Sequence, residues 1–216
     1  MNAILVSDFD GTMTLYDFYD LICQAFPEIS SHGFWRMYEE GLITHFEALR
    51  SIFGSIRTEE SRLIEIVNTM EIDPELASAV SLLEHSGWKT SIASAGCDWY
   101  IQLLLKSRGV SLPVHANPGI FSPDKGLMMS LPSSSPYCSN EFGINKMAVV
   151  QDALNQSSRV AFAGDGRPDL APSLLVKPQR RFAKHWLAKK LHELGEQYQP
   201  FETWKDVALQ LAKEPN

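Results

Sequence analysis

The sequence predicts an α/β protein in which an open, Rossmann-like parallel sheet carries an inserted helical cap. Three short apolar segments, residues 3–7, 88–96 and 159–166, have the composition of buried strands. Segments of helical periodicity separate them, and this alternation favours a parallel sheet. Each apolar segment ends in small or acidic residues. Because ligands bind such sheets outside the carboxyl ends of the strands, we expect one site at that edge.

Composition limits the classes of function. The 216 residues suit one sizeable domain or a domain with an insertion, and 44% hydrophobic with 21% charged residues is typical of a globular protein. The net charge is −7, and no long Lys/Arg cluster is present, so nucleic acid is not an expected partner. Residues 177–190 are locally basic, and we interpret them as a solvated helix face.

The cysteines and the N-terminal residues bear on localisation. Cys23, Cys97 and Cys138 are far apart and odd in number, which predicts neither a zinc site nor a disulfide framework. No signal-peptide pattern and no apolar run of membrane-spanning length is visible. We therefore expect a cytoplasmic protein without a membrane partner, either a monomer or a homodimer.

A helical block follows the first strand directly. Apolar residues recur at helical spacing from Asp17 to about Met70, as in Phe46, Leu49 and Phe53. Because the block is inserted where the first strand ends, we expect it to cover the site. The predicted catalytic core is 1–15 and 75–216, and the predicted cap is 16–74.

The rest of the chain predicts further elements. Asp73 and Pro74 are expected to open a helix that ends at Gly87, with Asp73 as its N-cap. Another helix is expected over 97–108, and two more around 184–195 and 203–213. The stretch 114–140 is interpreted as irregular, with a hairpin at 118–131 and a mobile loop at 132–140.

Four carboxylates are expected at the sheet edge, namely Asp8, Asp10, Asp165 and Asp169. They cannot all stay ionised close together without a compensating cation, because like charges repel. Mg²⁺ is the expected cofactor, since a hard divalent cation prefers oxygen ligands. Ser94 could offer a hydroxyl to an oxyanion, and Lys146 could supply a fixed positive charge at a helix start. Together these groups are typical of phosphoryl transfer.

Four short segments carry a resemblance to a known family. In order, "DFDGT", the strand-terminal Ser94, Lys146 and "GDGRPD" (164–169) resemble the four motifs of the haloacid dehalogenase-like superfamily. The resemblance implies that Asp8 is the nucleophile, forming an aspartyl-phosphate. It also implies that Asp10 protonates the leaving group and then deprotonates the hydrolytic water.

The same resemblance implies the ligands of the phosphoryl group and the metal. Thr12, Ser94, Ala95 and Lys146 would surround the phosphate. Mg²⁺ would be bound by Asp8, Asp165 and the backbone carbonyl of Asp10, with Asp169 supporting the metal site. The helical insertion is similar to the small helical cap type of the superfamily.

The presence of Asp10 favours phosphatases over dehalogenases, because displacing halide needs no acid. The chain resembles the phosphoserine phosphatase-related branch, above all the methionine-salvage phosphatases that act on an enol sugar-phosphate. The similarity lies in "DFDGTMTLYD", "SNEFGINK" and the tail from Phe182 to Trp204. Of the cysteine-rich stretch that precedes the lysine in the salvage enzymes, only Cys138 remains. Phosphoserine, phosphocholine and phosphoethanolamine phosphatases stay open, as does a non-catalytic phosphate-binding regulatory protein.

Specificity is expected to depend on the insertion. Asp17 lies where the chain leaves the core, so its side chain can face the leaving group. The arginine with which phosphoserine phosphatases bind the substrate carboxylate has no secure counterpart, since Arg50 is out of register. The insertion offers aromatic residues instead, namely Phe18, Phe34, Trp35, Tyr38, Phe46 and Phe53. We therefore expect a small phosphorylated polyol, keto-enol or amino-alcohol to be a better substrate than phosphoserine.

The six histidines show no metal-binding spacing. We interpret them as surface or internally satisfied residues, and the five tryptophans as packing residues; the histidines are His32, His45, His85, His115, His185 and His192.

Overall fold

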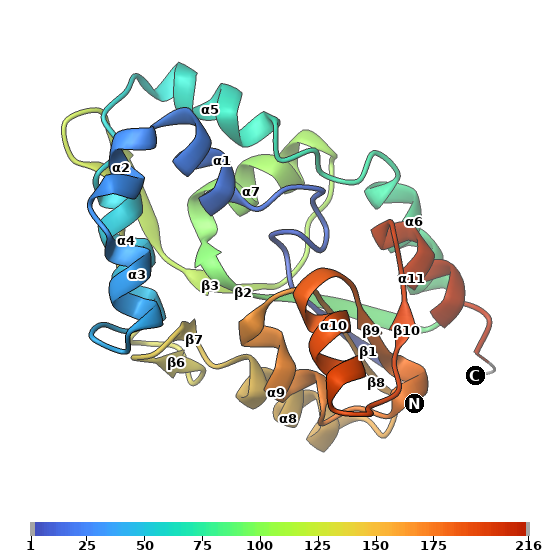
Figure 1. Ribbon diagram of the computed structural model, residues 1–216. Helices are drawn as coiled ribbons and strands as arrows, with labels where there is room; N and C mark the ends of the chain where they lie inside the picture. The colour runs from blue at the N-terminus through green and yellow to red at the C-terminus, as the bar shows by residue number, and fades with distance from the viewer. Residues whose placement is uncertain (1–2, 215–216) are drawn as a thin grey trace.

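The computed structural model describes residues 3–214, which form a six-stranded parallel sheet between helices (Figure 1). The strand order is β10-β9-β8-β1-β2-β3. The strands are β1 (Ala3–Ser7), β2 (Trp88–Cys97), β3 (Val114–Asn117), β8 (Val160–Gly164), β9 (Arg181–Ala183) and β10 (Gln199–Pro200). The predicted Rossmann-like α/β class is confirmed. Within residues 3–214, no helix has both the length and the apolar character to cross a membrane.

Strand β1 lies at the centre of the sheet and separates two hydrophobic cores. Ala3 and Leu5 belong to the larger core, together with side chains of α6 (Leu76–His85) and α11 (Trp204–Leu211). Val6 belongs to the smaller core, together with side chains of α8 (Lys146–Gln156). Alternate residues of a strand point to opposite faces, so β1, whose first four residues are apolar, packs against helices on both sides.

The helical block predicted after the first strand consists of five helices. They are α1 (Phe18–Ala25), α2 (Pro27–Ser31), α3 (Phe34–Glu39), α4 (His45–Gly54) and α5 (Glu60–Asn68). Figure 1 shows them together, coloured blue to cyan, on one side of the sheet. The segments that enter and leave this block are hydrogen-bonded side by side: Leu15 N donates to Met70 O (3.0 Å), and Asp73 N donates to Met13 O (3.0 Å). We keep the boundaries 16–74 as our proposal for the cap.

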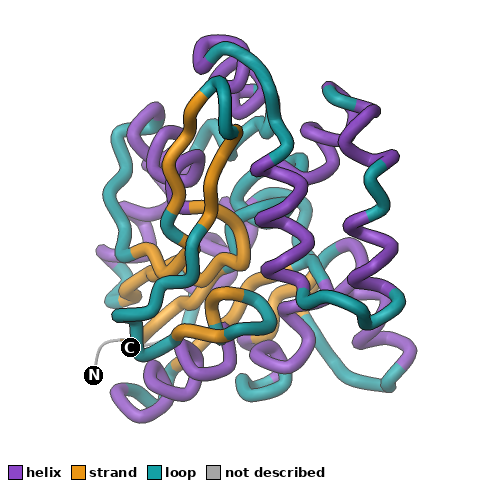
Figure 2. Tube along the Cα trace, turned by 90° about the vertical axis from the view of Figure 1, so that its left-hand side faces the viewer, coloured by secondary structure: helices purple, strands orange, loops and turns teal. Residues whose placement is uncertain are grey.

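The predicted hairpin is present as β4 (Gly119–Ser122) and β5 (Gly126–Met129), and it packs beside α4 (Figure 2). Gly126 has a φ of +76°, and a Cβ there would collide with the Phe53 and Gly54 carbonyls. Glycine is therefore required for this close approach. Residues 132–140 are only partly irregular, because β6 (Cys138–Ser139) pairs with β7 (Gly143–Ile144). The prediction of a loop over all of 132–140 is therefore wrong for Cys138 and Ser139, which form β6.

Three sheet strands were missed by the sequence analysis. The first four residues of the stretch interpreted as irregular form β3, which pairs with β2. Strands β9 and β10 have three and two residues, too few to show an apolar pattern. Helix α6 begins at Leu76 rather than directly after Asp73, because the Asp73 carboxylate instead accepts hydrogen bonds from the Glu75 and Lys205 amides (2.8 and 3.0 Å).

The interpretation of residues 177–190 as a solvated basic face is wrong for two side chains. Arg181, in β9, is buried and donates to the carbonyls of Ser173 (2.8 Å) and Val176 (3.3 Å) and to the Glu196 carboxylate (2.7 Å). Lys184 is also buried and lies 3.5 Å from Thr12 O. The two predicted C-terminal helices are α10 (His185–Glu193) and α11.

Candidate active site

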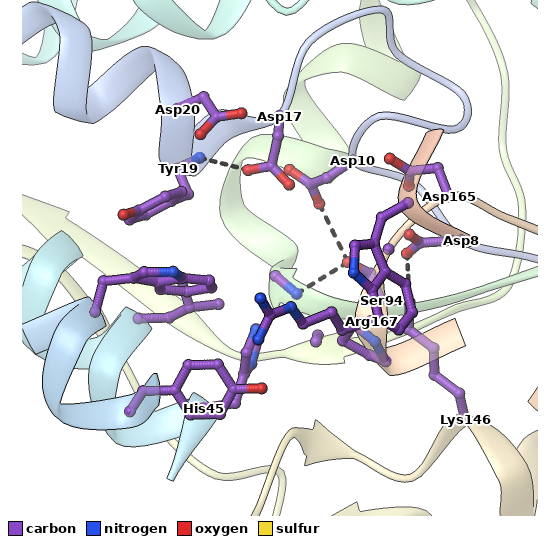
Figure 3. Close-up of a pocket in the computed structure, with 18 of the residues that line it drawn as sticks. Asp8, Asp10, Asp17, Tyr19, Asp20, His45, Ser94, Lys146, Asp165 and Arg167 are labelled. Carbon is purple, nitrogen blue, oxygen red and sulfur yellow. Dashed lines mark hydrogen bonds and ion pairs between the residues drawn. The ribbon is translucent and has the colours of Figure 1, made fainter. Parts of the chain in front are cut away.

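A pocket of about 350 Å³ lies where the carboxyl ends of β1, β2 and β8 meet the helical insertion (Figure 3). A cavity of this size suits a small organic ligand. Asp8, Ser94, Lys146 and Asp165 line it from the core, and Asp17 lines it from the start of the insertion. Residues more than 80 positions apart in the sequence therefore lie together in one pocket, as we expected from their positions at the ends of the predicted strands.

A buried cation lies between two buried carboxylates. Lys146 Nζ is 2.7 Å from Asp8 Oδ1 and 2.6 Å from Asp169 Oδ1. Burial raises the pKa of Asp8 well above its usual value, and the negative charge of Asp169 adds to this, while Lys146 opposes it. Burial by itself would lower the pKa of Lys146, but Asp169 and Asp8 outweigh it and raise that pKa. The lysine is therefore held in its charged form next to Asp8.

The other oxygen of Asp169 holds the loop after β8. Asp169 Oδ2 accepts hydrogen bonds from the backbone amides of Asp165 (3.0 Å) and Gly166 (2.9 Å). The carboxylate is fully buried and has partners for both oxygens, one of them the charged Lys146, as a buried charge requires. Asp169 thus positions Asp165 and Lys146 relative to each other.

Three carboxylates form a group that could bind a cation. Oxygens of Asp8, Asp165 and Asp169 lie within 4.8 Å of one another. Thr12 Oγ1 donates to Asp165 Oδ1 (3.1 Å), and His185 Nδ1 lies 3.3 Å from the other Asp165 oxygen. A set of carboxylate oxygens fits Mg²⁺ by its donor chemistry. The structure does not test the Asp10 carbonyl as a ligand, so this role stays a prediction.

Asp10 faces away from this group and into a separate hydrogen-bond network. Its Oδ2 accepts from the Tyr100 hydroxyl (2.9 Å) and from Ser94 Oγ (3.3 Å), and its Oδ1 accepts from the Phe18 amide (3.4 Å). Burial raises the pKa of Asp10 to about 6, although the hydrogen bond from Tyr100 lowers it. A carboxyl group in this condition can exchange a proton near neutral pH.

Tyr100 is a site residue that the sequence analysis missed. It lies on α7 (Asp98–Ser107) and is fully buried with the other apolar residues of that helix. Its spacing is that of a core residue, so no sequence signal distinguishes its hydroxyl from simple packing. Gly96 faces the same network, since a Cβ there would collide with the Tyr100 hydroxyl and lie 2.8 Å from an Asp10 oxygen.

Ser94 and Ala95 lie within β2, not at its end as the sequence predicted. The strand runs on to Cys97, and its pairing with β3 becomes irregular between Ala93 and Cys97. Ser94 Oγ accepts from the Gly96 amide (2.9 Å), and Ala95 O accepts from Asn117 Nδ2 (2.8 Å). Both residues still line the pocket.

At Gly11, in "DFDGT", the local geometry requires a glycine. Its φ is +65°, and a Cβ at this position would collide with the Asp165 carboxylate. Any side chain there would therefore strain the backbone and displace Asp165. The glycine lets the loop after β1 approach the loop after β8.

The insertion forms the opposite wall of the pocket. Asp17 caps α1, its Oδ1 accepting from the Tyr19 amide at 2.7 Å, and burial together with the Asp10 charge raises its pKa well above the usual value. Among the six expected aromatic residues, Trp35, Tyr38 and Phe53 line the pocket, whereas the other three do not. Lining residues that sequence reasoning missed are Tyr19, Asp20, His45, Tyr100, Arg167 and Trp186.

Two of the missed residues correct earlier interpretations. His45 is neither on the surface nor satisfied: it is 7% exposed, and its Nδ1 has no hydrogen-bond partner among the described residues. Trp186 lines the pocket beneath the Arg167 guanidinium, which lies 5.9 Å from its ring centre. Arg167 Nη2 is also 3.7 Å from Glu39 Oε1 of α3, so this contact joins the core to the insertion.

Comparisons with known proteins agree on one class. No family model matches the chain. Two curated proteins named 2-hydroxy-3-keto-5-methylthiopentenyl-1-phosphate phosphatase are similar to it. The one from Brevibacillus brevis is 24% identical over 94% of this chain and 92% of its own length. The one from Bacillus cereus is 22% identical over 98% and 96%.

Solved structures share the fold over nearly the whole chain. A HAD family hydrolase, t0658, from Salmonella enterica serovar Typhi superposes with a TM-score of 0.72 at 20% identity, covering 99% of this chain and 72% of that one. A phosphoserine phosphatase from T. onnurineus gives 0.66 at 15% identity, covering 99% and 96%. A substrate-bound phosphoserine phosphatase gives 0.63 at 14% identity, covering 88% and 90%.

Proposed function

This chain has the fold of the haloacid dehalogenase-like hydrolases, and from that premise we propose that it hydrolyses a small phosphorylated metabolite with the help of Mg²⁺. One observation carries the proposal: the Asp8 carboxylate is held against Lys146 beside a carboxylate group that suits a cation, in a pocket that also contains Asp10. Nucleophile, fixed cation and proton donor are the parts that phosphoryl transfer requires.

In the proposed first step, an Asp8 oxygen attacks phosphorus and the ester oxygen of the substrate leaves, giving an aspartyl-phosphate and an alcohol. Asp10 donates the proton that the leaving oxygen needs, and then takes a proton from the water that hydrolyses the aspartyl-phosphate. Lys146 offsets negative charge on the phosphoryl oxygens, with Ser94 and the Ala95 region beside them and Thr12 holding Asp165. Asp8, Asp165 and the Asp10 backbone carbonyl would hold Mg²⁺, with Asp169 supporting the site, and the bound ion would neutralise phosphoryl charge.

The substrate that we propose first is the methionine-salvage enol-phosphate for which the curated relatives are named. The pocket supports this over phosphoserine, because Arg167 is the one arginine among its described lining residues and it lies in the core near Glu39. Arg50 is exposed and lies over the Phe46 ring. Phosphocholine and phosphoethanolamine remain alternative substrates, since Asp17 and Asp20 face the same pocket.

The test of the proposed function is a screen of purified protein against phosphomonoesters in the presence of Mg²⁺. We expect release of inorganic phosphate from phenyl phosphate and from at least one small metabolite. Phosphate binding without turnover of any ester would instead identify a non-catalytic phosphate-binding protein and would overturn the proposal.

Removing divalent cations with EDTA is expected to abolish phosphate release, and added Mg²⁺ is expected to restore it. The physical reason is the repulsion among the carboxylates of Asp8, Asp165 and Asp169, which a cation would offset. Activity is measured before chelation, after chelation and after adding Mg²⁺ back, with circular dichroism to verify that the fold persists. Full activity in excess EDTA would contradict the assignment of the metal site.

Asp10→Asn is expected to slow the hydrolysis of alkyl phosphates about 10²–10⁴-fold, which is the usual contribution of general acid catalysis. Activated aryl phosphates should be affected far less in the first step, because their leaving groups need no proton. The measurement is kcat/KM for an alkyl and a nitrophenyl phosphate in both proteins. Tyr100→Phe serves as a comparison, since it removes one hydrogen bond to Asp10 and keeps the carboxyl group. Equal losses on both esters would argue that Asp10 acts only on the local structure.

A further inference from the structure

The wall of the pocket opposite Asp8 contains one imidazole among aromatic rings. The His45 ring centre lies 5.2 Å from that of Tyr38, 5.7 Å from that of Trp35 and 5.5 Å from that of Phe142. Figure 3 shows His45 and Tyr19 on the side of the pocket away from Asp8 and Lys146. Edge-on contacts with Tyr38 and Trp35 fix the plane of the imidazole in this wall.

The backbone beneath His45 is also held in place. Helix α4 begins at His45 and is preceded by a capping box, in which Thr44 and Glu47 bond each other's backbone amides (2.9 and 3.2 Å). The next residue, Phe46, donates its amide to Glu141 O (2.8 Å), which ties the helix start to the loop between β6 and β7. His45 is therefore preorganised without using either of its ring nitrogens.

Those nitrogens have no hydrogen-bond partner in the part of the chain that the structure describes. The Nδ1 atom is closed off from the surroundings, and the ring makes no hydrogen bond with any residue between 3 and 214, so Nε2 is the nitrogen left for a group in the pocket. Buried polar side chains nearly always have a hydrogen-bond partner, so this exception calls for a ligand or a water. Because His45 lines the pocket next to the proposed reaction site, the group that completes its hydrogen bonding can be part of the substrate.

The charge of the imidazole limits what it can bind. Burial lowers the pKa of His45 to about 4, and the positive charge of Lys146 lowers it further. The ring is therefore uncharged at neutral pH, with one N–H donor and one bare nitrogen. A neutral imidazole offers no ion pair to a carboxylate, but it hydrogen-bonds well to a carbonyl or hydroxyl oxygen.

We propose that His45 is a specificity-determining residue that hydrogen-bonds to an uncharged oxygen, a carbonyl or hydroxyl, on the leaving group of the substrate. The inference rests on the proposed function and narrows it to esters with an oxygen-bearing, uncharged and partly apolar leaving group. The apolar part would lie against Trp35, Tyr38 and Phe53, which also line the pocket.

The alternative interpretation of this wall is that it binds a cationic leaving group. Asp17 and Asp20 also line the pocket, and aromatic rings attract cations. The two readings differ in the residue on which specificity depends: His45 for a neutral oxygen, Asp17 and Asp20 for an ammonium group. Matched pairs of substrates separate them, because one pair differs only in uncharged oxygen groups and the other only in a positive charge.

The experiment compares kcat/KM for dihydroxyacetone phosphate and n-propyl phosphate, which differ by a carbonyl on the middle carbon and a hydroxyl on the carbon farthest from the phosphate. Wild-type protein should prefer dihydroxyacetone phosphate by about tenfold or more, the value of one net hydrogen bond. His45→Phe keeps the aromatic packing but removes both nitrogens, so the preference should fall to within about threefold. His45→Gln returns an N–H donor and should restore part of the preference.

Controls separate this role from a structural one. His192→Phe makes the same substitution at an exposed position of α10 and should leave the preference unchanged. The melting temperature of His45→Phe should not fall, because a ring replaces a ring. An equal preference in wild type and His45→Phe, with phenyl phosphate still hydrolysed, would overturn the role of His45 and leave the proposed function intact.

Two other outcomes are equally informative. The second pair is phosphocholine and its uncharged analogue 3,3-dimethylbutyl phosphate. A preference for phosphocholine that His45→Phe does not alter would assign the wall to cations and contradict the proposal. Failure of the wild-type protein to hydrolyse any ester, phenyl phosphate included, would overturn the proposed function and this inference together.

Discussion

Replacing Asp8 with asparagine is expected to abolish phosphate release while leaving the protein folded. The amide has nearly the shape of the carboxylate, but it lacks the charge and the nucleophilic oxygen that attack phosphorus. Loss of the nucleophile should lower kcat by a factor on the order of 10³ or more. Folding should survive, because Lys146 keeps Asp169 as a partner at 2.6 Å.

The matched control is Asp124→Asn, which makes the same change on the exposed turn between β4 and β5. Steady-state phosphate release and urea unfolding are measured for both variants. The free energy of unfolding of Asp8→Asn should match or exceed that of the wild type, because burial and the Asp169 charge disfavour the Asp8 carboxylate. Turnover above about a tenth of the wild-type rate would exclude Asp8 as the nucleophile.

Lys146→Met is expected to have the largest effect on stability. The methionine is similar in length and apolar, but the Asp8 and Asp169 carboxylates would lose the cation that lies between them. Breaking a buried ion pair by removing one partner costs about 3–5 kcal/mol, because the remaining charge is left uncompensated. Activity should be lost as well, since the positive charge next to the nucleophile is removed.

Urea unfolding at neutral pH measures this loss, with Lys125→Met on the exposed β4–β5 turn as the matched control. The double variant Lys146→Met with Asp169→Asn removes one of the two carboxylates and should recover part of the stability. A loss below about 1 kcal/mol in Lys146→Met would mean that the two carboxylates do not depend on the lysine, contrary to the geometry.

The central strands could be predicted from the sequence, whereas the edge strands could not. Strands β1, β2 and β8 are largely buried, so apolar and small residues predominate in them and make them recognisable. Strand β9 has three residues and includes the buried Arg181, and β10 has two and includes Pro200. Their pairing depends on where the tertiary fold brings them, and a few residues at a sheet edge contain no pattern.

The residues of the candidate site also divide into those that the sequence could predict and those that it could not. Asp8, Ser94 and Asp165 lie at or near the ends of recognisable strands, so their common placement follows from the direction of a parallel sheet. Tyr100 and His45 lie on helices, where a residue that faces a pocket has the same spacing as one that faces the core. Their roles depend on contacts across large sequence separations, which local periodicity does not encode.

The paired entry and exit of the helical insertion has an evolutionary consequence. Because the chain leaves the sheet near Leu15 and returns near Met70 at hydrogen-bonding distance, the ends of the intervening segment nearly coincide in space. A segment of different length or architecture can be exchanged between such ends without moving β1 or the residues that follow it. Lineages could then acquire new substrates by replacing one contiguous module, while the machinery for phosphoryl transfer is inherited unchanged.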